Sequence, residues 1–378
     1  MSASSPAKLF TSLKLGGKDG LSLDHRIVMA PLTRTRAVAG ECEHTDVGAI
    51  YYNQRASKGG LIIAEASQIT PQGQGYPFTP GCYSEAQVKA WKKITDAVHQ
   101  KGGIIFLQLW HVGRVRYADS VSSSDIAMTD LPCFNLKTFE QVTAEPPKSL
   151  SVEEIKTIVE QYGAAAKNAI EAGFDGVEIH GANGYLIDQF IQDGVNKRTD
   201  EYGGSIENRL RFMREVVESV LKAVNGESNR VGIRISPSGA LHQMSDSTPT
   251  ETFSEVAKTL DKYDLAFLHV VEPRTSLMYS KSTEEVEQTE TVACKHLRQF
   301  FKNPIIAAGG FNRQTAIEMV ERGDADLVAF GRHFISTPDL PYRLEKDLPL
   351  NKYNRETFYY AGGDLATGYT DYPFHQQE

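Results

Sequence analysis

The chain has 378 residues, of which 40% are hydrophobic and 23% charged, and a formal net charge of -8, values that indicate a globular protein without a nucleic-acid surface. The four cysteines are scattered and form no Cys-x-x-Cys pair, so neither a zinc site nor a redox dithiol is indicated and a reducing compartment is expected. The first residues carry no apolar signal segment and no run approaches a membrane span, so we expect a cytoplasmic protein with no membrane partner.

Short apolar runs then alternate with helical patterns along the chain. Residues 8–23 hold two apolar patches around glycines and predict a small hairpin ahead of the main fold. Eight apolar runs, most of them rich in β-branched residues, predict strands at residues 26–30, 61–64, 104–109, 175–180, 230–235, 266–271, 304–308 and 325–330. Helical patterns follow at residues 46–57, 84–101, 151–172, 206–224, 249–263, 291–301 and 312–322.

Two of the predicted helices have a marked start, because Ser84 precedes Gln87 and Ser151 precedes Glu154 by the spacing of a capping box. Between the third strand and the second of these helices, residues 112–147 are polar, serine-rich and aperiodic. A loop this long inside a compact domain is usually a lid or a binding loop. Residues 338–378 carry helix signals and then irregular, aromatic-rich sequence.

Eight strands that alternate with helices predict parallel βα units, and eight units in this length fit a closed (β/α)8 TIM barrel in one α/β domain, residues 1–378. The alternative is a doubly wound open sheet, which would place a Gly-x-Gly-x-x-Gly turn after the first strand. The first strand is followed by Pro31, Leu32 and Thr33 instead. Glycines follow the seventh and eighth strands, where barrels commonly bind phosphate, and this placement favours the barrel.

The carboxyl ends of barrel strands carry the active site. In this chain they supply mainly hydrogen-bonding groups: Thr33, Glu65, Ala66, Gln108, Trp110, His180, Asn183, Tyr185, Arg234, Glu272, Arg274, Gly309, Gly310, Gly331 and Arg332. No lysine ends a strand, which disfavours a Schiff-base aldolase, and no metal-ligand spacing or Gly-x-Ser-x-Gly turn is present. Such a rim suits a planar heterocycle that carries a phosphate.

Each of these residues also has a structural explanation. Glu65, Glu178 and Arg234 could form a buried charge network that fills the barrel, and for Glu178 this explanation is favoured. A lone histidine such as His180 is more often structural, and Arg332 could pair with a surface carboxylate. Their convergence on one predicted rim is what favours function.

The segments FDGVEIHGANGYLIDQF (174–190) and NKRTDEYGGSIENRLRF (196–212) resemble the Old Yellow Enzyme family of FMN-dependent ene-reductases. Further matching segments, such as IVMAPLTRTRA (27–37) and DLVAFGRHFISTPDLPYRL (326–344), run through nearly the whole chain. The sequence is most similar to the branch that includes plant 12-oxophytodienoate reductases and bacterial ene-reductases.

The resemblance implies a non-covalent FMN site in the barrel and NADPH as the reductant. The flavin ring would be lined by Pro31, Leu32, Thr33, Ala66 and Gln108. Arg234 would face the flavin N1 and O2 edge. The phosphate would be held by Gly309, Gly310, Gly331 and Arg332.

The resemblance also implies a substrate, an α,β-unsaturated carbonyl compound. His180 and Asn183 would hold its carbonyl oxygen, hydride would pass from flavin N5 to its β-carbon, and Tyr185 would give a proton to its α-carbon. Trp110, Phe358 and Tyr359 would shape the pocket. Arg274 would meet a substrate acid group or a dinucleotide phosphate.

Asn183 stands where plant 12-oxophytodienoate reductases have His, and residues 112–147 match weakly, so the physiological substrate stays open, as does the choice between monomer and homodimer. A related demethylase or dienoyl reductase is disfavoured because the cysteines are too scattered for an iron–sulfur cluster. A non-catalytic FMN-binding protein is disfavoured by the intact His180, Asn183 and Tyr185 set. The charged residues 196–205 are interpreted as a structured loop that leads into the next helix.

Overall fold

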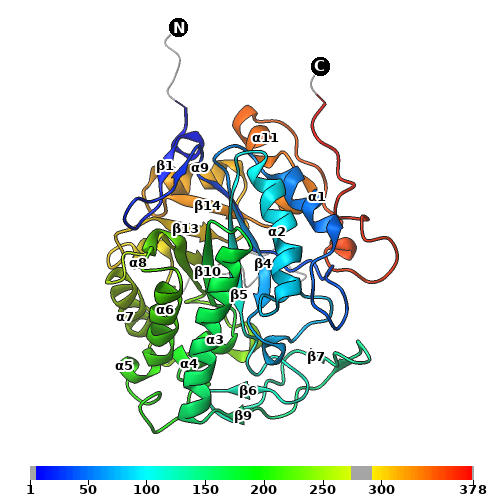
Figure 1. The fold of residues 1–378 in the computed structure, drawn as a ribbon. Helices are drawn as coiled ribbons and strands as arrows, with labels where there is room; N and C mark the ends of the chain where they lie inside the picture. Colours follow the sequence, from blue (N-terminus) through cyan, green and yellow to red (C-terminus); the bar gives the residue numbers. More distant parts are fainter. Residues whose placement is uncertain (1–5, 274–291, 377–378) are drawn as a thin grey trace.

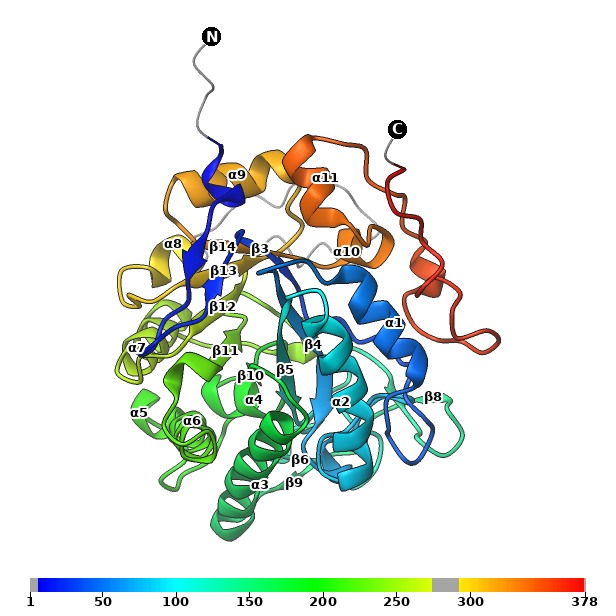
Figure 2. The ribbon, with the colours of Figure 1, turned by 45° about the horizontal axis from the view of Figure 1, so that its top comes forward.

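The computed structural model describes residues 6–273 and 292–376, and a closed barrel of eight parallel strands stands at its centre (Figures 1 and 2). The barrel strands are β3 (Ile27–Met29), β4 (Leu61–Gln68), β5 (Ile104–Trp110), β10 (Gly176–Gly181), β11 (Val231–Ile235), β12 (Phe267–Val271), β13 (Ile305–Ala308) and β14 (Leu327–Phe330). Each strand pairs with the next in chain order, and β14 pairs with β3 to close the ring. The predicted (β/α)8 barrel is confirmed, and the open doubly wound sheet is excluded.

Helices surround the barrel (Figure 2). In the described residues the α-helices are α1 (Asp46–Arg55), α2 (Glu85–His99), α3 (Val152–Glu171), α4 (Leu186–Ile191), α5 (Ile206–Arg209), α6 (Arg211–Ala223), α7 (Pro249–Asp261), α8 (Cys294–Leu297), α9 (Arg313–Glu321), α10 (Arg332–Ser336) and α11 (Leu340–Lys346). None of them is both long and apolar enough to cross a membrane.

The helix predictions differ from the structure in four places, one of which is the five-residue α10, which was not predicted. The helix expected over residues 206–224 is divided at Leu210 into α5 and α6, and the helix expected over 291–301 is reduced to the short α8. Helix α4 was not predicted. All six of its residues are buried, so no polar face gives it a helical period in the sequence.

Both predicted capping boxes are present. The Ser84 hydroxyl accepts a bond from the Gln87 amide nitrogen at 3.3 Å while the Gln87 side chain accepts one from the Ser84 nitrogen at 3.2 Å. Ser151 and Glu154 do the same at the start of α3. Gly173, at φ +90°, follows α3 in a conformation that suits glycine. These local signals fix where α2 and α3 start, and hence how they lie on the barrel.

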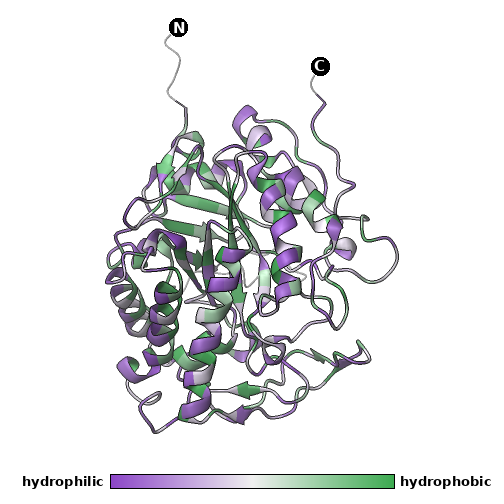
Figure 3. Cartoon of the chain, in the orientation of Figure 1, coloured by the Kyte–Doolittle hydropathy of each residue, from purple (hydrophilic) through white to green (hydrophobic). Residues whose placement is uncertain are grey.

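The interior of the barrel is apolar where the strands begin and polar where they end. At one end Leu15 and Leu23, from the hairpin of β1 (Leu13–Lys14) and β2 (Ser22–Leu23), belong to an apolar cluster with Phe106, Phe267 and other strand residues. The predicted N-terminal hairpin is therefore confirmed, and it packs against the amino ends of the strands. Colouring by hydropathy shows the strands as mainly apolar and the surrounding helices as mixed (Figure 3).

The long connection between β5 and α3 lies at the opposite end of the barrel from the β1–β2 hairpin (Figure 1). It contains two small sheets, in which β6 (Val121–Ser122) pairs in parallel with β9 (Lys148–Ser149) and β7 (Cys133–Phe134) pairs antiparallel with β8 (Gln141–Val142). Strands of two residues leave no alternation in a sequence, which is why residues 112–147 read as structureless.

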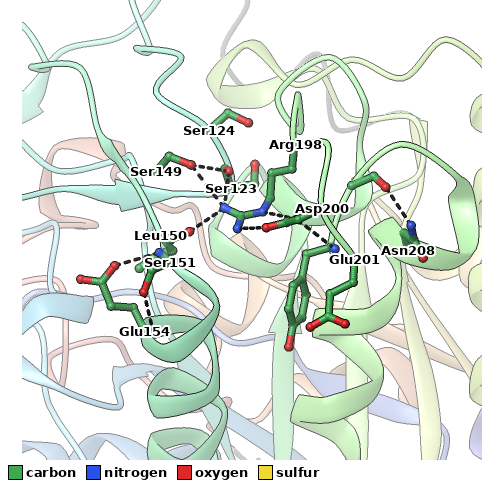
Figure 4. Close-up of polar contacts among 12 residues, drawn as sticks. Ser123, Ser124, Ser149, Leu150, Ser151, Glu154, Arg198, Asp200, Glu201 and Asn208 are labelled. Carbon is green, nitrogen blue, oxygen red and sulfur yellow. Dashed lines mark hydrogen bonds and ion pairs between the residues drawn. The ribbon is translucent and has the colours of Figure 1, made fainter.

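Arg198 ties this connection to the charged segment at residues 196–205 (Figure 4). Its guanidinium donates to the carbonyl oxygens of Ser123 at 3.0 Å and Leu150 at 2.6 Å, and to the carboxylate of Asp200 at 3.0 Å. Its hydrogen-bonding capacity is thus used within the fold. The interpretation of residues 196–205 as a structured loop is confirmed.

The C-terminal segment lies against the loop that follows β3. Arg34 donates to the carbonyl oxygens of Phe358 at 2.9 Å and Gly368 at 2.7 Å, and its side chain is fully buried. The ring of Tyr369 stacks on that of Tyr51 in α1, with 3.9 Å between the centroids. The irregular tail is therefore fixed next to the first strand of the barrel.

Candidate active site

A polar layer fills the carboxyl half of the barrel, because the strand register sets its side chains side by side. Glu178 in β10 is opposite Gln108 in β5, and Arg234 in β11 is opposite His269 in β12. The Glu178 carboxylate accepts a bond from the Gln108 amide at 2.7 Å and lies 2.7 Å from His269 Nδ1. This confirms the structural explanation favoured for Glu178. It also fixes the orientation of the Gln108 amide, since the amino group must face the carboxylate.

Glu65 does not join that network, contrary to the grouping considered from the sequence. Its carboxylate lies 2.9 Å from His44 Nε2 and 3.3 Å from the Tyr52 hydroxyl, and it accepts a bond from the Arg34 backbone nitrogen at 3.2 Å. Glu65 therefore holds the loop after β3 in place through its bond with the Arg34 backbone nitrogen. Strand position alone could not separate the two carboxylates, since both are buried in strands of the same barrel.

His180 follows Glu178 by two residues, so its side chain lies on the same inner face of β10. Its Nδ1 accepts a bond from the Ala182 backbone nitrogen at 3.3 Å, which puts the proton of a neutral ring on Nε2. Burial, with the nearby Arg234 and His269, lowers the pKa of His180 well below its usual value. The side chain is therefore a neutral Nε2–H donor.

Asn183 and Tyr185 stand in the turn that leaves β10. Asn183 adopts φ +59°, a left-handed conformation that asparagine tolerates better than most residues, and its backbone nitrogen donates to the Ser236 hydroxyl at 2.7 Å. The Tyr185 ring lies 5.0 Å from the His180 ring and 5.0 Å from that of Trp110, between centroids. The predicted trio of His180, Asn183 and Tyr185 is thus gathered at one strand end.

The long connection builds a wall beside this trio. An apolar cluster joins Trp110 and Ala66 of the barrel to Val115, Met128 and Cys133 of the connection. Tyr76, from the loop after β4, stacks on Trp110 with 5.6 Å between centroids. Trp110, which was expected to shape the substrate pocket, therefore lies beside the trio.

A second group of predicted residues lies at the ends of β13 and β14. Gly310 has φ +66°, and among the described residues a Cβ built on it would come within 4 Å of only one atom, the Nη2 of Arg332, at 3.9 Å. A Cβ on Gly331 would meet the Leu32 side chain at 3.2 Å. Gly309 completes the turn. An open glycine turn facing a guanidinium is a suitable cradle for a phosphate.

These features fit an FMN-type ligand. Besides the phosphate cradle, the Nε of Arg234 is buried and has no hydrogen-bond partner in residues 6–273 and 292–376. Pro31 and Thr33 are half-buried in the loop between the cradle and the trio. A buried N–H donor without a partner is costly unless a ligand satisfies it, so the interior of the site is suited to receive one.

One predicted residue is not part of this arrangement. Tyr359 is 56% exposed on the tail. Arg274 lies outside the described residues. Phe358 is half-buried and contacts Tyr353, over which the Arg332 guanidinium also lies, so it belongs with the phosphate end.

Sequence reasoning missed several residues beside the trio. The Asp188 carboxylate accepts bonds from the Gly184 nitrogen at 2.9 Å and from the Ser236 hydroxyl at 3.3 Å. His242 Nδ1 lies 2.7 Å from the Asn183 carbonyl oxygen. Asp188 falls inside the recognised motif, whereas His242 lies in an irregular turn that carries no signal.

Comparison with known proteins agrees with this geometry. The family model described as "NADH:flavin oxidoreductase / NADH oxidase family" matches residues 8–351. The chain is 46% identical over 378 residues to a putative 12-oxophytodienoate reductase 11 of Oryza sativa subsp. japonica, covering 98% of both chains. Among solved structures, morphinone reductase in complex with tetrahydroNAD is 42% identical at TM-score 0.87, covering 97% of this chain and 98% of that one. The old yellow enzyme homologue from Zymomonas mobilis is 39% identical at TM-score 0.87, covering 97% and 99%.

Proposed function

Since the chain belongs to the Old Yellow Enzyme family of FMN-dependent NADH:flavin oxidoreductases, we propose that it reduces the C=C bond of α,β-unsaturated carbonyl compounds. The observation that carries the proposal is the gathering of His180, Asn183 and Tyr185 at one strand end, on the same rim as the cradle of Gly310 and Arg332. We further propose that residues 1–378 act as one FMN-binding domain.

The residues that would hold FMN come from most of the barrel. The ring would be lined by Pro31, Leu32, Thr33, Ala66 and Gln108, with Arg234 at its N1 and O2 edge. The phosphate would be held by Gly309, Gly310, Gly331 and Arg332. When bound there, FMN supplies the hydride for the β-carbon of the substrate.

His180 and Asn183 activate the substrate by holding its carbonyl oxygen. A neutral His180 donates from Nε2, and the Asn183 side-chain amide donates beside it. Because the site is buried, two fixed donors stabilise negative charge on that oxygen more than they would in water. The charge drawn to the oxygen leaves the β-carbon electron-poor, and Trp110 shapes the space around the carbon skeleton.

Tyr185 completes the reaction as the general acid. Its O–H bond breaks as the α-carbon takes the proton, and a phenolate remains. A phenol suits this task because it keeps its proton at neutral pH until a carbanion-like carbon lies beside it.

The reductant is NAD(P)H, and family resemblance favours NADPH. One structural neighbour, morphinone reductase, is in complex with tetrahydroNAD, a nicotinamide compound, which supports a nicotinamide reductant in general. Comparing kcat/KM for NADPH and NADH in the purified holoenzyme decides between the two.

The test is reduction of cyclohexenone by the FMN-loaded protein. We expect Tyr185→Phe to lower its rate by about 10²- to 10⁴-fold, the usual contribution of a positioned general acid. Flavin reduction by NADPH, followed by absorbance, is the control and should be retained. A protein that binds no FMN, or a Tyr185→Phe variant with full cyclohexenone turnover, contradicts the proposal.

A further inference from the structure

We propose that Tyr76 and His242 form a relay that returns a proton to Tyr185 after each turnover. The inference rests on the proposed function, since it concerns the fate of the Tyr185 phenolate. It adds two residues that act through Tyr185 and that nothing in the sequence pattern singled out.

The side chains of Tyr185, Tyr76 and His242 form a hydrogen-bonded series in the described residues. The Tyr185 hydroxyl donates to the Tyr76 hydroxyl at 3.3 Å, and the Tyr76 hydroxyl lies 3.4 Å from His242 Nε2. The rings of Tyr185 and His242 are 5.2 Å apart between centroids. Both polar contacts are long, as catalytic hydrogen bonds often are before a substrate closes the site.

The His242 end of this hydrogen-bonded series fixes the direction in which the hydroxyl groups donate. His242 Nδ1 lies 2.7 Å from the Asn183 carbonyl oxygen, which can only accept, so Nδ1 carries the proton. Burial lowers the pKa of His242 to about 4, so the resting ring is neutral and Nε2 is a free lone pair for the Tyr76 hydroxyl. In the resting state the hydroxyls therefore point from Tyr185 to Tyr76 to His242.

Neighbouring side chains hold both Tyr76 and His242 in place. The Tyr76 ring stacks on Trp110 with an interplanar angle of 14°. The carbonyl oxygen of His242 accepts a bond from the Arg114 guanidinium at 2.7 Å. His242 itself is buried, but its neighbours Ala240 and Gln243 are exposed, so the relay ends within two residues of water.

The steps balance without any oxidant or reductant. After Tyr185 gives its proton to the α-carbon, the Tyr76 O–H bond breaks as a new O–H bond forms on the Tyr185 oxygen. The Tyr76 oxygen then takes a proton from Nε2 of a His242 that hydronium or a buffer acid has protonated, which leaves water or the buffer base behind. The ring returns to its neutral form, and one proton from the solution has replaced the one delivered to the product.

The experiment compares two substrates of the FMN-loaded enzyme. Cyclohexenone needs a proton on carbon, whereas benzoquinone takes its protons on oxygen atoms that exchange directly with water. We expect Tyr76→Phe, which keeps the ring on Trp110, to lower the ratio of cyclohexenone to benzoquinone turnover by about tenfold, less than the loss of the general acid itself. Added imidazole buffer should restore the ratio as its concentration rises, because a small acid can protonate Tyr185 directly.

His242→Asn is the second variant. Asparagine tolerates the φ of +59° at this position and can still donate to the Asn183 carbonyl oxygen, but it lacks the Nε2 atom. It should lower the same ratio and respond to imidazole. Tyr263→Phe, which removes a hydroxyl bonded to Glu218 on the outer helices, is the matched control and should leave the ratio unchanged.

The outcomes separate the two proposals. If Tyr185→Phe lowers the ratio and neither Tyr76→Phe nor His242→Asn does, the relay is wrong and the general acid stands. Equal losses with both substrates, without rescue by imidazole, would show a structural role only and overturn the relay. If Tyr185→Phe leaves the ratio intact, the proposed function itself fails.

Discussion

The buried carboxyl group of Asp188 lies directly beneath the active-site turn. It accepts bonds from Gly184 and Ser236, and Ser236 in turn accepts the backbone N–H of Asn183. The left-handed conformation of Asn183 is therefore held by a short series of hydrogen bonds that starts at this carboxyl. Its cost is that an acid is kept away from water, and burial raises the pKa of Asp188 from 3.8 to about 6.

This raised pKa predicts a pH-dependent stability. Because the folded pKa lies above the unfolded one, the folded state binds the proton more tightly. The contribution is complete below the unfolded value and is lost as pH rises through about 6. We expect Asp188→Asn, which cannot ionise, to gain unfolding free energy relative to the natural protein between about pH 4 and pH 8, by up to about 3 kcal/mol.

Urea unfolding at several pH values measures this gain. Asp193→Asn is the contrasting variant. Although partial burial acts the other way, bonds from Ser247 leave the pKa of Asp193 below its usual value, so its difference from the natural protein should have the opposite slope. A constant difference for Asp188→Asn across the pH range would contradict the prediction.

Helices and strands were predictable wherever a signal was local. The eight barrel strands are short apolar runs, and Ser84 and Ser151 mark the starts of α2 and α3 through contacts within three residues. Helix α4 was missed because it has no polar face. The motif located His180, Asn183 and Tyr185, but the pairing of Tyr76 with His242 joins positions 166 residues apart in two irregular turns, and no local pattern encodes it.

The tail is held to the barrel by side chains rather than by regular structure, so its attachment should depend on single residues. Arg34→Lys removes most of the donors that reach Phe358 and Gly368 and loses the contacts of the guanidinium with the Tyr51 and Tyr369 rings, whose centroids lie 5.1 Å and 5.0 Å from it. We expect the unfolding free energy to fall by about 2–4 kcal/mol. Limited proteolysis with mass spectrometry should show new cleavage in residues 352–376.

Arg322→Lys makes the same substitution at a 56% exposed side chain that pairs with Asp324. That variant should unfold and resist protease as the natural protein does. An Arg34→Lys protein with an intact, protease-resistant tail would show that the stacked aromatic rings alone hold the segment.

In the whole molecule, the candidate site draws on strands from around the ring. The cradle comes from the ends of β13 and β14, the trio from the end of β10, and the other proposed ligand-binding residues from β4, β5 and β11 and the loop after β3. A ligand that touches all of them stabilises the closed barrel as a unit. Binding to the folded state alone adds about 2.7 kcal/mol when the free ligand is at a hundred times Kd.

Removing FMN should therefore lower the Tm of the whole protein, and adding it back should restore the Tm. Arg332→Met should reduce the FMN-dependent rise while leaving the Tm of the stripped protein nearly unchanged. Arg355→Met is the matched control, since its guanidinium lies over the same Tyr353 ring, at 5.8 Å against 5.7 Å for Arg332. Equal effects of the two substitutions would argue against a phosphate contact by Arg332.

The hydrogen bonds between Arg34 and the C-terminal tail also limit when the two segments can join during synthesis. Its partners Phe358 and Gly368 are separated from it by 324 and 334 residues, so they leave the ribosome long after Arg34 does. At about 5–20 residues per second, the interval is on the order of tens of seconds. During that interval the arginine in the loop after β3 has neither of these two carbonyl partners, and until β14 has been made the ring cannot close between β14 and β3. The loop that follows β3 therefore gains these two partners only after all eight barrel strands have been synthesised.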